Sequence, residues 1–325
     1  MTFLPLGRCS KSGGGRSFAK LRMKKETMKL EIKDINKVLI LGAGTLGLRV
    51  ALQSAISGFE TTVYDINEKA FEAAIKIQDG ILRSLLKREL ITEDEIEVVK
   101  ARLTFTTDAK AAADDADFLN ESVTENLELK KQVWAQFGGL CPAKTLFTSN
   151  TSYLLPSQIA EATGRPERFC NFHFHDVFFA NVVDIMPHDT TEDWITDFLF
   201  EMGRKLNQTP VFVKKENPGY IFNYMLMALI GAAGALKTMD VGSIEDIDRS
   251  WMGNFKMEMG PFGVLDTVGL DTAWHITSSQ PDKKSQAFAA LLKTYIDEGK
   301  LGVKVGEGFY KYPNPRYKDP DFIQG

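Results

Sequence analysis

Short apolar runs alternate with longer amphipathic stretches through the first two thirds of the chain. Five runs have the length and apolar content of buried strands: KVLIL (37–41), ETTVYD (60–65), LTFTT (103–107), ADFLN (116–120) and TLFTS (145–149). Helical stretches separate them, as LRVALQSAIS does after the first run. Strands that alternate with helices predict a doubly wound α/β fold, with a mostly parallel sheet covered by helices on both faces.

The strand signals stop after TPVFVKK (209–215), and from Asn217 the chain has the pattern of helices. We therefore expect an α/β domain over 34–216 and an all-α domain over 217–325. The uncharged run from Pro218 to Leu236 is almost long enough to span a bilayer. Asn217 and Pro218 suit a helix cap and a first helical residue, and Asn223 is polar, so the run predicts a buried or subunit-facing helix and no membrane association.

Residues 1–25 contain seven Lys or Arg and no acidic residue. Such a segment has too little apolar surface to fold alone, so a disordered tail is expected over 1–33. Two explanations stay open for its composition. It is either a targeting segment or the product of a start codon placed too early, with Met23 or Met28 as the natural first residue.

The chain of 325 residues has an ordinary globular composition, with 44% hydrophobic and 25% charged residues. Its net charge of −4 gives no electrostatic reason to expect a nucleic-acid partner, so a small molecule is the expected ligand. Cys9, Cys141 and Cys170 lack the spacing of a zinc ribbon or a redox pair. Unpaired cysteines fit a reducing compartment, and we expect a cytoplasmic protein.

The segment from Gly42 to Gly47 has the pattern GxGxxG, directly after a strand and at the start of a helix. This context is typical of a Rossmann domain, in which Gly42, Gly44, Thr45, Leu46 and Gly47 bring backbone N–H groups close to a diphosphate. Asp65 ends the next strand, where a carboxylate binds the adenosine ribose. The same carboxylate repels a 2′-phosphate, and the following Ile-Asn offers no arginine, so the sequence predicts NAD as the cofactor.

Three of the four histidines lie in one segment, NFHFHDVFFANVVDIMPH (171–188). On a strand, His173 and His175 share one face while Phe172 and Phe174 point to the other. Two imidazoles on one face are a legitimate metal-ligand spacing and, with Asp184, would suit a metal-assisted hydrolase. Alternatively one histidine is a working base and the other is not.

Five later segments, in the same order, resemble the short-chain L-3-hydroxyacyl-CoA dehydrogenases, including the bacterial 3-hydroxybutyryl-CoA enzymes. The likeness runs from about residue 37 to residue 312 and rests on ENLELK (125–130), SNTS (149–152), RFCNFHF (168–174), PGYIFN (218–223) and GVKVGEGFYKY (302–312). It implies NAD-dependent oxidation of an L-3-hydroxyacyl-CoA to the 3-ketoacyl-CoA, or the reverse reduction, in fatty-acid metabolism such as β-oxidation. It also implies a homodimer formed through the helical domain.

The resemblance assigns roles to particular residues. His173 falls on the catalytic base, and Ser152 and Asn223 fall on groups that bind the substrate oxygen. Histidine suits a base because it titrates near neutral pH, and Asp184 would hold its tautomer as the acid of a triad does. The cofactor contacts implied beyond the glycine loop and Asp65 are Glu125, Lys130, Ser152, Asp176 and Lys304. No metal ligand is assigned.

The chain departs from the family pattern after His173. Where the family has HFFNPVPVMKLVEV, this chain has HFHDVFFANVVDIM, in which the histidine and the acid are one residue closer together and the acid is aspartate instead of glutamate. His175 and Asp176 replace phenylalanine and asparagine, which adds a negative charge near the nicotinamide pocket. These changes leave open both whether His173 and Asp184 are in contact and whether the substrate is the usual acyl-CoA.

Two other readings therefore stay open. The segment VVDIMPH is similar to one in dehydrogenases of free polar hydroxy acids, of the gulonate or carnitine type, whereas Lys87 and Arg88 favour an acyl-CoA. A non-enzymatic protein on this scaffold, as in lens crystallins, is disfavoured by the intact Ser152, His173 and Asn223.

Overall fold

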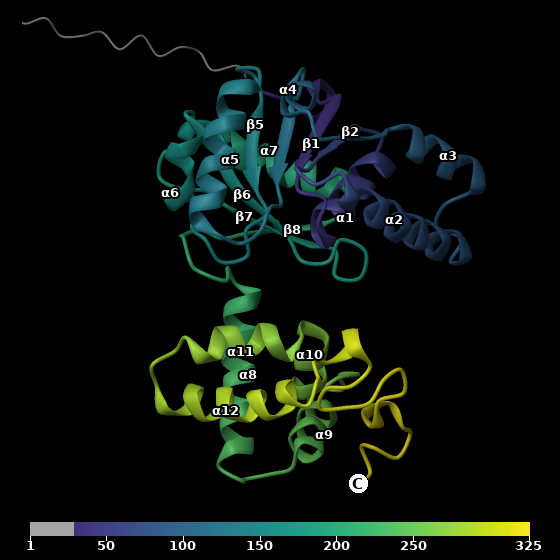
Figure 1. Cartoon of the computed structure of the whole chain (residues 1–325), viewed down its shortest axis with the longest axis vertical. Helices are drawn as coiled ribbons and strands as arrows, with labels where there is room; N and C mark the ends of the chain where they lie inside the picture. Colours follow the sequence, from purple (N-terminus) through teal and green to yellow (C-terminus); the bar gives the residue numbers. More distant parts are fainter. Residues whose placement is uncertain (1–28) are drawn as a thin grey trace, which may run out of the picture.

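The computed structural model describes residues 29–325, which form two domains joined at helix α8 (Figure 1). The first domain contains the sheet and the second is built of helices. Residues 1–28 lie outside the described part, and with them most of the expected tail. Leu30 is 6% exposed and packs in the first domain's core with Ile35, so the folded part begins earlier than the predicted residue 34.

One eight-stranded sheet organises the first domain, in the order β3-β2-β1-β4-β5-β6-β7-β8. The strands from β1 to β6 pair in parallel, β7 is antiparallel to β6, and β8 is parallel to β7. Their bounds are β1 Lys37–Leu41, β2 Glu60–Tyr64, β3 Leu103–Thr106, β4 Phe118–Glu121, β5 Leu146–Ser149, β6 Phe169–Phe174, β7 Val182–Met186 and β8 Thr209–Phe212. The predicted doubly wound fold is confirmed, and the loops that follow β1, β4, β5 and β6 meet at one edge of the sheet.

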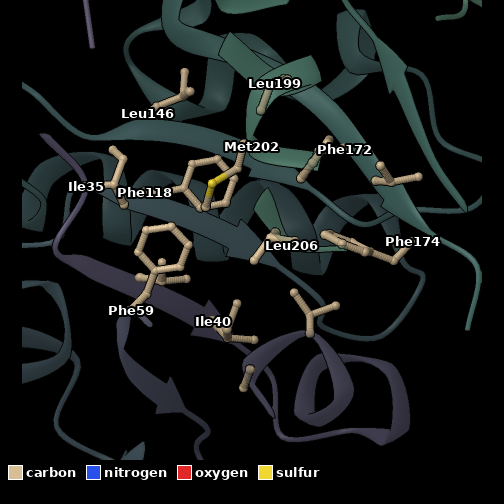
Figure 2. Packing of buried hydrophobic residues seen from close by; sticks show 14 of the residues in the cluster. Ile35, Ile40, Phe59, Phe118, Leu146, Phe172, Phe174, Leu199, Met202 and Leu206 are labelled. Carbon is tan, nitrogen blue, oxygen red and sulfur yellow. The ribbon is translucent and has the colours of Figure 1, made fainter. Parts of the chain in front are cut away.

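Helices cover both faces of this sheet. Helices α1 and α7 pack on one face, where Figure 2 shows Phe118, Phe172, Phe174, Leu199 and Met202 in one cluster of buried residues. Helices α4, α5 and α6 pack on the other. The helices are α1 Thr45–Ile56, α2 Lys69–Lys87, α3 Glu93–Ala101, α4 Ala109–Ala113, α5 Leu127–Leu140, α6 Pro156–Ile159 and α7 Asp193–Lys205, with short 3₁₀ turns at Ile32–Asp34, Ala160–Thr163 and Pro166–Arg168.

The second domain is a helical bundle around a separate core that includes Phe262, Leu265 and Phe288. Its helices are α8 Phe222–Thr238, α9 Ile244–Phe255, α10 Pro261–Val268, α11 Leu270–Ser278 and α12 Lys283–Asp297, followed by 3₁₀ turns at Val303–Val305 and Arg316–Lys318. In Figure 1, α8 leaves the lower edge of the sheet domain and runs through this bundle.

Helix α8 begins at Phe222, four residues later than the cap and proline suggested. Gly219 and Tyr220 have φ angles of +79° and +54°, which no α-helix accommodates. The Asn217 side chain instead donates to the Tyr220 carbonyl at 2.7 Å, and so stabilises a turn ahead of the helix. Within residues 29–325, no helix combines the length and the apolar character needed to span a bilayer.

Candidate active site

Two glycines of the GxGxxG segment are required by the protein's own packing. Gly42 has a φ of +103°, and a Cβ there would lie 2.7 Å from the Ser122 carbonyl oxygen. A Cβ on Gly47 would lie 2.2 Å from the Gly42 oxygen. The turn from β1 into α1 is therefore pressed against the end of β4, where no side chain fits.

Gly44 is different, because a Cβ added to it would meet no protein atom within 4 Å. Its φ of −69° and ψ of 175° are open to any residue. Gly44 is the N-cap of α1, and no side chain caps the first N–H groups of that helix. An exposed helix N-terminus with free donors and room in front of it suits an anion such as a diphosphate.

A cavity of about 270 Å³ lies beside this helix end. Its lining comprises Gly42, Gly44, Tyr64, Asp65, Ile66, Ser122, Val123, Thr124, Leu129 and Val133. The Asp65 carboxylate is fixed there by N–H groups from Ala43 at 2.8 Å and Asn67 at 2.9 Å. The lining thus combines backbone donors for a diphosphate, a carboxylate for a ribose and the exposed Ile66 for a base, and it fits the adenosine half of a dinucleotide.

Lys130 is not placed as predicted, because its side chain is only 1% exposed. Its ammonium group lies 2.6 Å from the buried Glu121 carboxylate and donates to the Val123 carbonyl at 3.0 Å. Glu121 also accepts from the Val123 N–H and the Ser149 hydroxyl. This buried pair holds the ends of β4 and β5 together and shapes the wall of the cavity, so Lys130 stabilises the cofactor site without lining it.

Glu125 lies on the other side of the same lysine, and its side chain is 41% exposed. One oxygen accepts from the Thr151 hydroxyl at 2.5 Å and from the N–H groups of Ser152 and Tyr153 at 3.1 and 2.9 Å. Glu125 therefore fixes the backbone of the loop after β5 that presents Ser152.

His173 lies at the centre of a hydrogen-bonded chain of three side chains. Its Nε2 is 3.1 Å from Ser152 Oγ, and its Nδ1 is 3.1 Å from Asp184 Oδ2. His173 on β6 and Asp184 on β7 are paired directly across the antiparallel ladder, so their side chains share a face. The missing residue and the shorter acid have thus not broken the contact. In the arrangement that this implies, Nδ1 donates to Asp184 and Nε2 accepts from Ser152.

His173 and Asp184 shift each other's pKa. Burial lowers the pKa of His173, while the hydrogen bond to Asp184 opposes that shift. Burial would raise the pKa of Asp184, but hydrogen bonds from His173 and His175 outweigh it and hold the pKa below its usual value. At neutral pH the site therefore contains a carboxylate and a neutral imidazole whose free nitrogen can accept a proton.

His175 binds the same carboxylate oxygen as His173, with its Nε2 2.9 Å from Asp184 Oδ2. The alternation expected for β6 is thus present, with both imidazoles on one face. Phe222 of α8 meets the His175 ring edge-on at 5.3 Å. The two imidazoles and Asp184 place three potential metal-ligand atoms within 4.8 Å of one another.

Tyr220 is a site residue that the sequence reasoning missed. Its ring stacks on the His173 imidazole at 4.7 Å between centroids, with an angle of 11°. Its buried hydroxyl donates to the Thr151 carbonyl at 2.6 Å and accepts from the Asn171 amide at 3.0 Å. The signal was the tyrosine in PGYIFN, where the resembled pattern has phenylalanine. Tyr220 links the base, the Ser152 loop and the segment leading to α8.

Arg49 is a second missed residue, and it changes the role expected for Asp176. The Arg49 guanidinium on α1 forms an ion pair with the Asp176 carboxylate, which also accepts from the Phe179 N–H at 3.0 Å. The extra negative charge near the nicotinamide pocket is therefore balanced within the protein. This pair ties the β6–β7 loop to the helix that begins at the glycine turn.

Asn223 and Lys304 are not brought into the His173 chain. Asn223 is half-buried in the first turn of α8, and its side chain forms no hydrogen bond with any described residue. The Lys304 ammonium, which was expected to approach the cofactor, instead lies 2.6 Å from both carboxylate oxygens of Asp271 in the helical domain.

Comparison with known proteins gives the family. The model of the 3-hydroxyacyl-CoA dehydrogenase NAD binding domain matches residues 37–217, and that of the C-terminal domain matches residues 219–312. A probable 3-hydroxyacyl-CoA dehydrogenase of Caenorhabditis elegans is 32% identical over 87% of this chain and 94% of its own length. A probable 3-hydroxybutyryl-CoA dehydrogenase of Bacillus subtilis is 30% identical over 86% of this chain and 98% of its own.

Among solved structures, a diketoreductase described as acting on dicarbonyl compounds is 37% identical. It superposes with a TM-score of 0.81 over 86% of this chain and 99% of its own. The family models and the relatives agree with the dinucleotide pocket and confirm NAD as the cofactor. The chain belongs to the 3-hydroxyacyl-CoA dehydrogenase family and is an NAD-dependent oxidoreductase.

Proposed function

We propose that this enzyme oxidises the 3-hydroxyl of an L-3-hydroxyacyl-CoA to the 3-ketone, or catalyses the reverse reduction, with His173 as the general base or acid. The observation that supports this best is the chain Ser152–His173–Asp184, with distances of 3.1 Å at both of its links. A histidine held in such a chain can serve as the base that accepts the hydroxyl proton of a secondary alcohol.

In the oxidation, the substrate hydroxyl lies within hydrogen-bond reach of both Ser152 Oγ and His173 Nε2, which are already adjacent to each other. His173 Nε2 takes the hydroxyl proton, and the imidazolium formed is stabilised by Asp184 at Nδ1. The stacked Tyr220 ring keeps the imidazole plane fixed and shields one of its faces from water. When bound, NAD would supply the hydride acceptor for the carbon that carries the hydroxyl.

The protein holds the cofactor through groups of its own that are already in place. The N-terminus of α1 at Gly44 would bind the diphosphate, and Asp65 the adenosine ribose. Glu125 fixes the Ser152 loop, and Ser152 Oγ lies 3.1 Å from His173 Nε2. These contacts set the distance between the two reacting centres, which decides the rate as much as the base does.

The thioester substrate is supported by the family and by the exposed basic residues Lys87 and Arg88 at the end of α2. The test is NADH formation with L-3-hydroxybutyryl-CoA, longer 3-hydroxyacyl-CoAs, gulonate and carnitine. We expect the highest kcat/KM with a CoA ester. A kcat/KM at least tenfold higher for a free hydroxy acid would refute the CoA assignment while leaving the base in place.

A second candidate is a dehydrogenase or reductase of small hydroxy or dicarbonyl compounds that carry no CoA. Two observations favour it: the 37% identical structure is a diketoreductase, and the loop after β6 differs from the family pattern at His175 and Asp176. The two candidates are distinguished in the reductive direction by comparing the rate of NADH oxidation with a small dicarbonyl compound and with acetoacetyl-CoA.

A homodimer through the helical domain is supported by the surface of α8 and α9. An apolar groove of about 660 Å³ lies between these helices. It is lined by residues that include Leu229, Leu236, Val241, Trp251 and Phe255. Exposed apolar surface of this extent on a folded domain is typical of an interface. Light scattering coupled to size exclusion, with Phe255→Glu as the disrupting variant, tests it.

A further inference from the structure

His175 has no part in the proton path from the substrate to His173, although it lies beside it. It stands where the family pattern has phenylalanine, which has no nitrogen. Its side chain is 11% exposed, compared with 4% for His173 and 2% for Asp184, so it is the most accessible of the three. Its Nε2 lies 2.9 Å from Asp184 Oδ2.

We propose that His173, His175 and Asp184 form a site for a transition-metal ion such as Zn²⁺, and that occupancy of this site switches the enzyme off. The site belongs to β6 and β7, which supply all three ligands from one face of two paired strands. Within residues 29–325 this is the one cluster of three His, Cys, Asp or Glu side chains close enough to share an ion.

The two distances to the carboxylate suit the ion after a small adjustment, whereas the imidazole nitrogens, which lie within 4.8 Å of each other, must rotate closer together. Zinc bonds of about 2.0–2.2 Å place the ligand atoms of a tetrahedral site about 3.3–3.5 Å apart. Here Asp184 Oδ2 lies 3.1 Å from His173 Nδ1 and 2.9 Å from His175 Nε2, and all three atoms lie within 4.8 Å of one another. The ion would take the place of two hydrogen atoms, and the fourth position would remain for water.

The donor set selects the class of metal. Two imidazole nitrogens and one carboxylate oxygen suit Zn²⁺, Co²⁺ or Cu²⁺, whereas Mg²⁺ and Ca²⁺ prefer oxygen ligands throughout. Cys141 and Cys170 are buried singly and belong to no such cluster.

Occupancy would block the base through its tautomer. Each neutral imidazole keeps its one proton, but His173 must move it from Nδ1 to Nε2 when Nδ1 binds the ion. Nε2 then donates toward Ser152 and the substrate oxygen, and it can no longer accept the hydroxyl proton. This consequence rests on the proposed role of His173, whereas the binding of the ion does not.

Binding is tested with Co²⁺, which absorbs visible light when it is four-coordinate. Metal-free enzyme, His175→Phe and His275→Phe are titrated with CoCl₂, and NAD binding verifies that each is folded. His275 is an exposed histidine on α11, so its variant is a matched change away from the site. We expect cobalt bands in the parent and in His275→Phe, with affinity reduced at least about 10- to 100-fold in His175→Phe. His175→Gln replaces the phenylalanine variant if the latter does not fold.

Inhibition is measured next, as the rate of alcohol oxidation with ZnCl₂ relative to each variant's own metal-free rate. We expect zinc to inhibit the parent and His275→Phe, EDTA to restore them, and His175→Phe to resist zinc. Equal cobalt binding by all three proteins would overturn the site. Cobalt binding through His175 without zinc inhibition would overturn the tautomer argument. An enzyme inactive on every substrate would refute the proposed function, and the cobalt titration would still decide the site.

Discussion

Gly42 and Gly44 lie two residues apart in one motif, but the structure requires them for different reasons, and substitutions separate those reasons. We predict that Gly44→Asp leaves the fold intact and weakens NAD binding, whereas Gly42→Ala weakens the fold. At Gly44 the backbone suits any residue and a Cβ meets nothing within 4 Å. Aspartate is moreover a preferred N-cap, so the free energy of unfolding should stay within about 1 kcal/mol of the parent.

The size of the binding defect follows from charge. A carboxylate about 4 Å from a phosphate repels it by about 1 kcal/mol in water and about 4 kcal/mol at an effective dielectric constant of 20. The dissociation constant of NAD should therefore rise about 5- to 1,000-fold. Gly44→Asn has nearly the same size without the charge, and should keep most of the affinity that Gly44→Asp loses.

At Gly42 an added side chain lowers the free energy of unfolding in two ways. A positive φ on alanine costs about 1–3 kcal/mol, and a Cβ 2.7 Å from the Ser122 oxygen costs about 1–3 kcal/mol more. Urea unfolding and isothermal titration with NAD give both quantities for each variant. The reasoning fails if Gly44→Asp unfolds as readily as Gly42→Ala, or if it binds NAD within a factor of two of the parent.

Three further predictions concern the base, the cofactor and the N-terminus. His173→Gln should lower kcat about 100- to 10,000-fold with little change in NAD affinity, and Asp184→Asn should lower kcat by up to about 10,000-fold. His175→Phe should lower kcat far less, and EDTA should not reduce the rate. Steady-state kinetics check this, and a loss in His175→Phe equal to that in His173→Gln would contradict it. Asp65→Ser with an arginine introduced nearby should narrow the preference for NAD over NADP, measured as a ratio of kcat/KM, and a parent that favours NADP would be incompatible with the role of Asp65. A chain beginning at Met28 should fold and turn over normally in the same assay, because it keeps Leu30 in the core, and loss of NAD binding would show that residues 1–27 are needed.

Periodicity was sufficient to predict the faces of β6. Because alternate residues on a strand point to opposite faces, Phe172 and Phe174 had to share one face and His173 and His175 the other. Figure 2 shows the two phenylalanines in the core between the sheet and α7. The same reasoning located the glycine turn and Asp65, because strand, turn and helix follow one another locally in the chain.

Strand pairing was beyond the reach of the sequence, and the His173 to Asp184 contact depends on it. The deletion relative to the family pattern left that distance open. In the structure the loop between β6 and β7 contains the buried Val177 with a φ of +83°, and the register sets His173 opposite Asp184. Side chains directly opposite across a ladder are close enough for the shorter aspartate to reach the imidazole.

The charged residues at the cofactor edge show why a family position does not by itself define a contact. Lys130 and Asp176 were expected to contact the cofactor because of their positions in the resembled pattern, but each has a partner inside the protein, in Glu121 and Arg49. Those partners come from other elements, so they could be found only once the chain was folded. A buried charge without a partner is strongly destabilising, so the pairing of the buried Lys130 with Glu121 is a condition of the fold, whereas the half-buried Arg49 and Asp176 join two neighbouring segments. The glycine turn, the Ser152 loop and the β6–β7 loop are each fixed by an internal ion pair or hydrogen bond, so this edge of the sheet is organised before NAD binds. The binding of the cofactor therefore needs to supply little of the free energy that brings His173 and the substrate oxygen together.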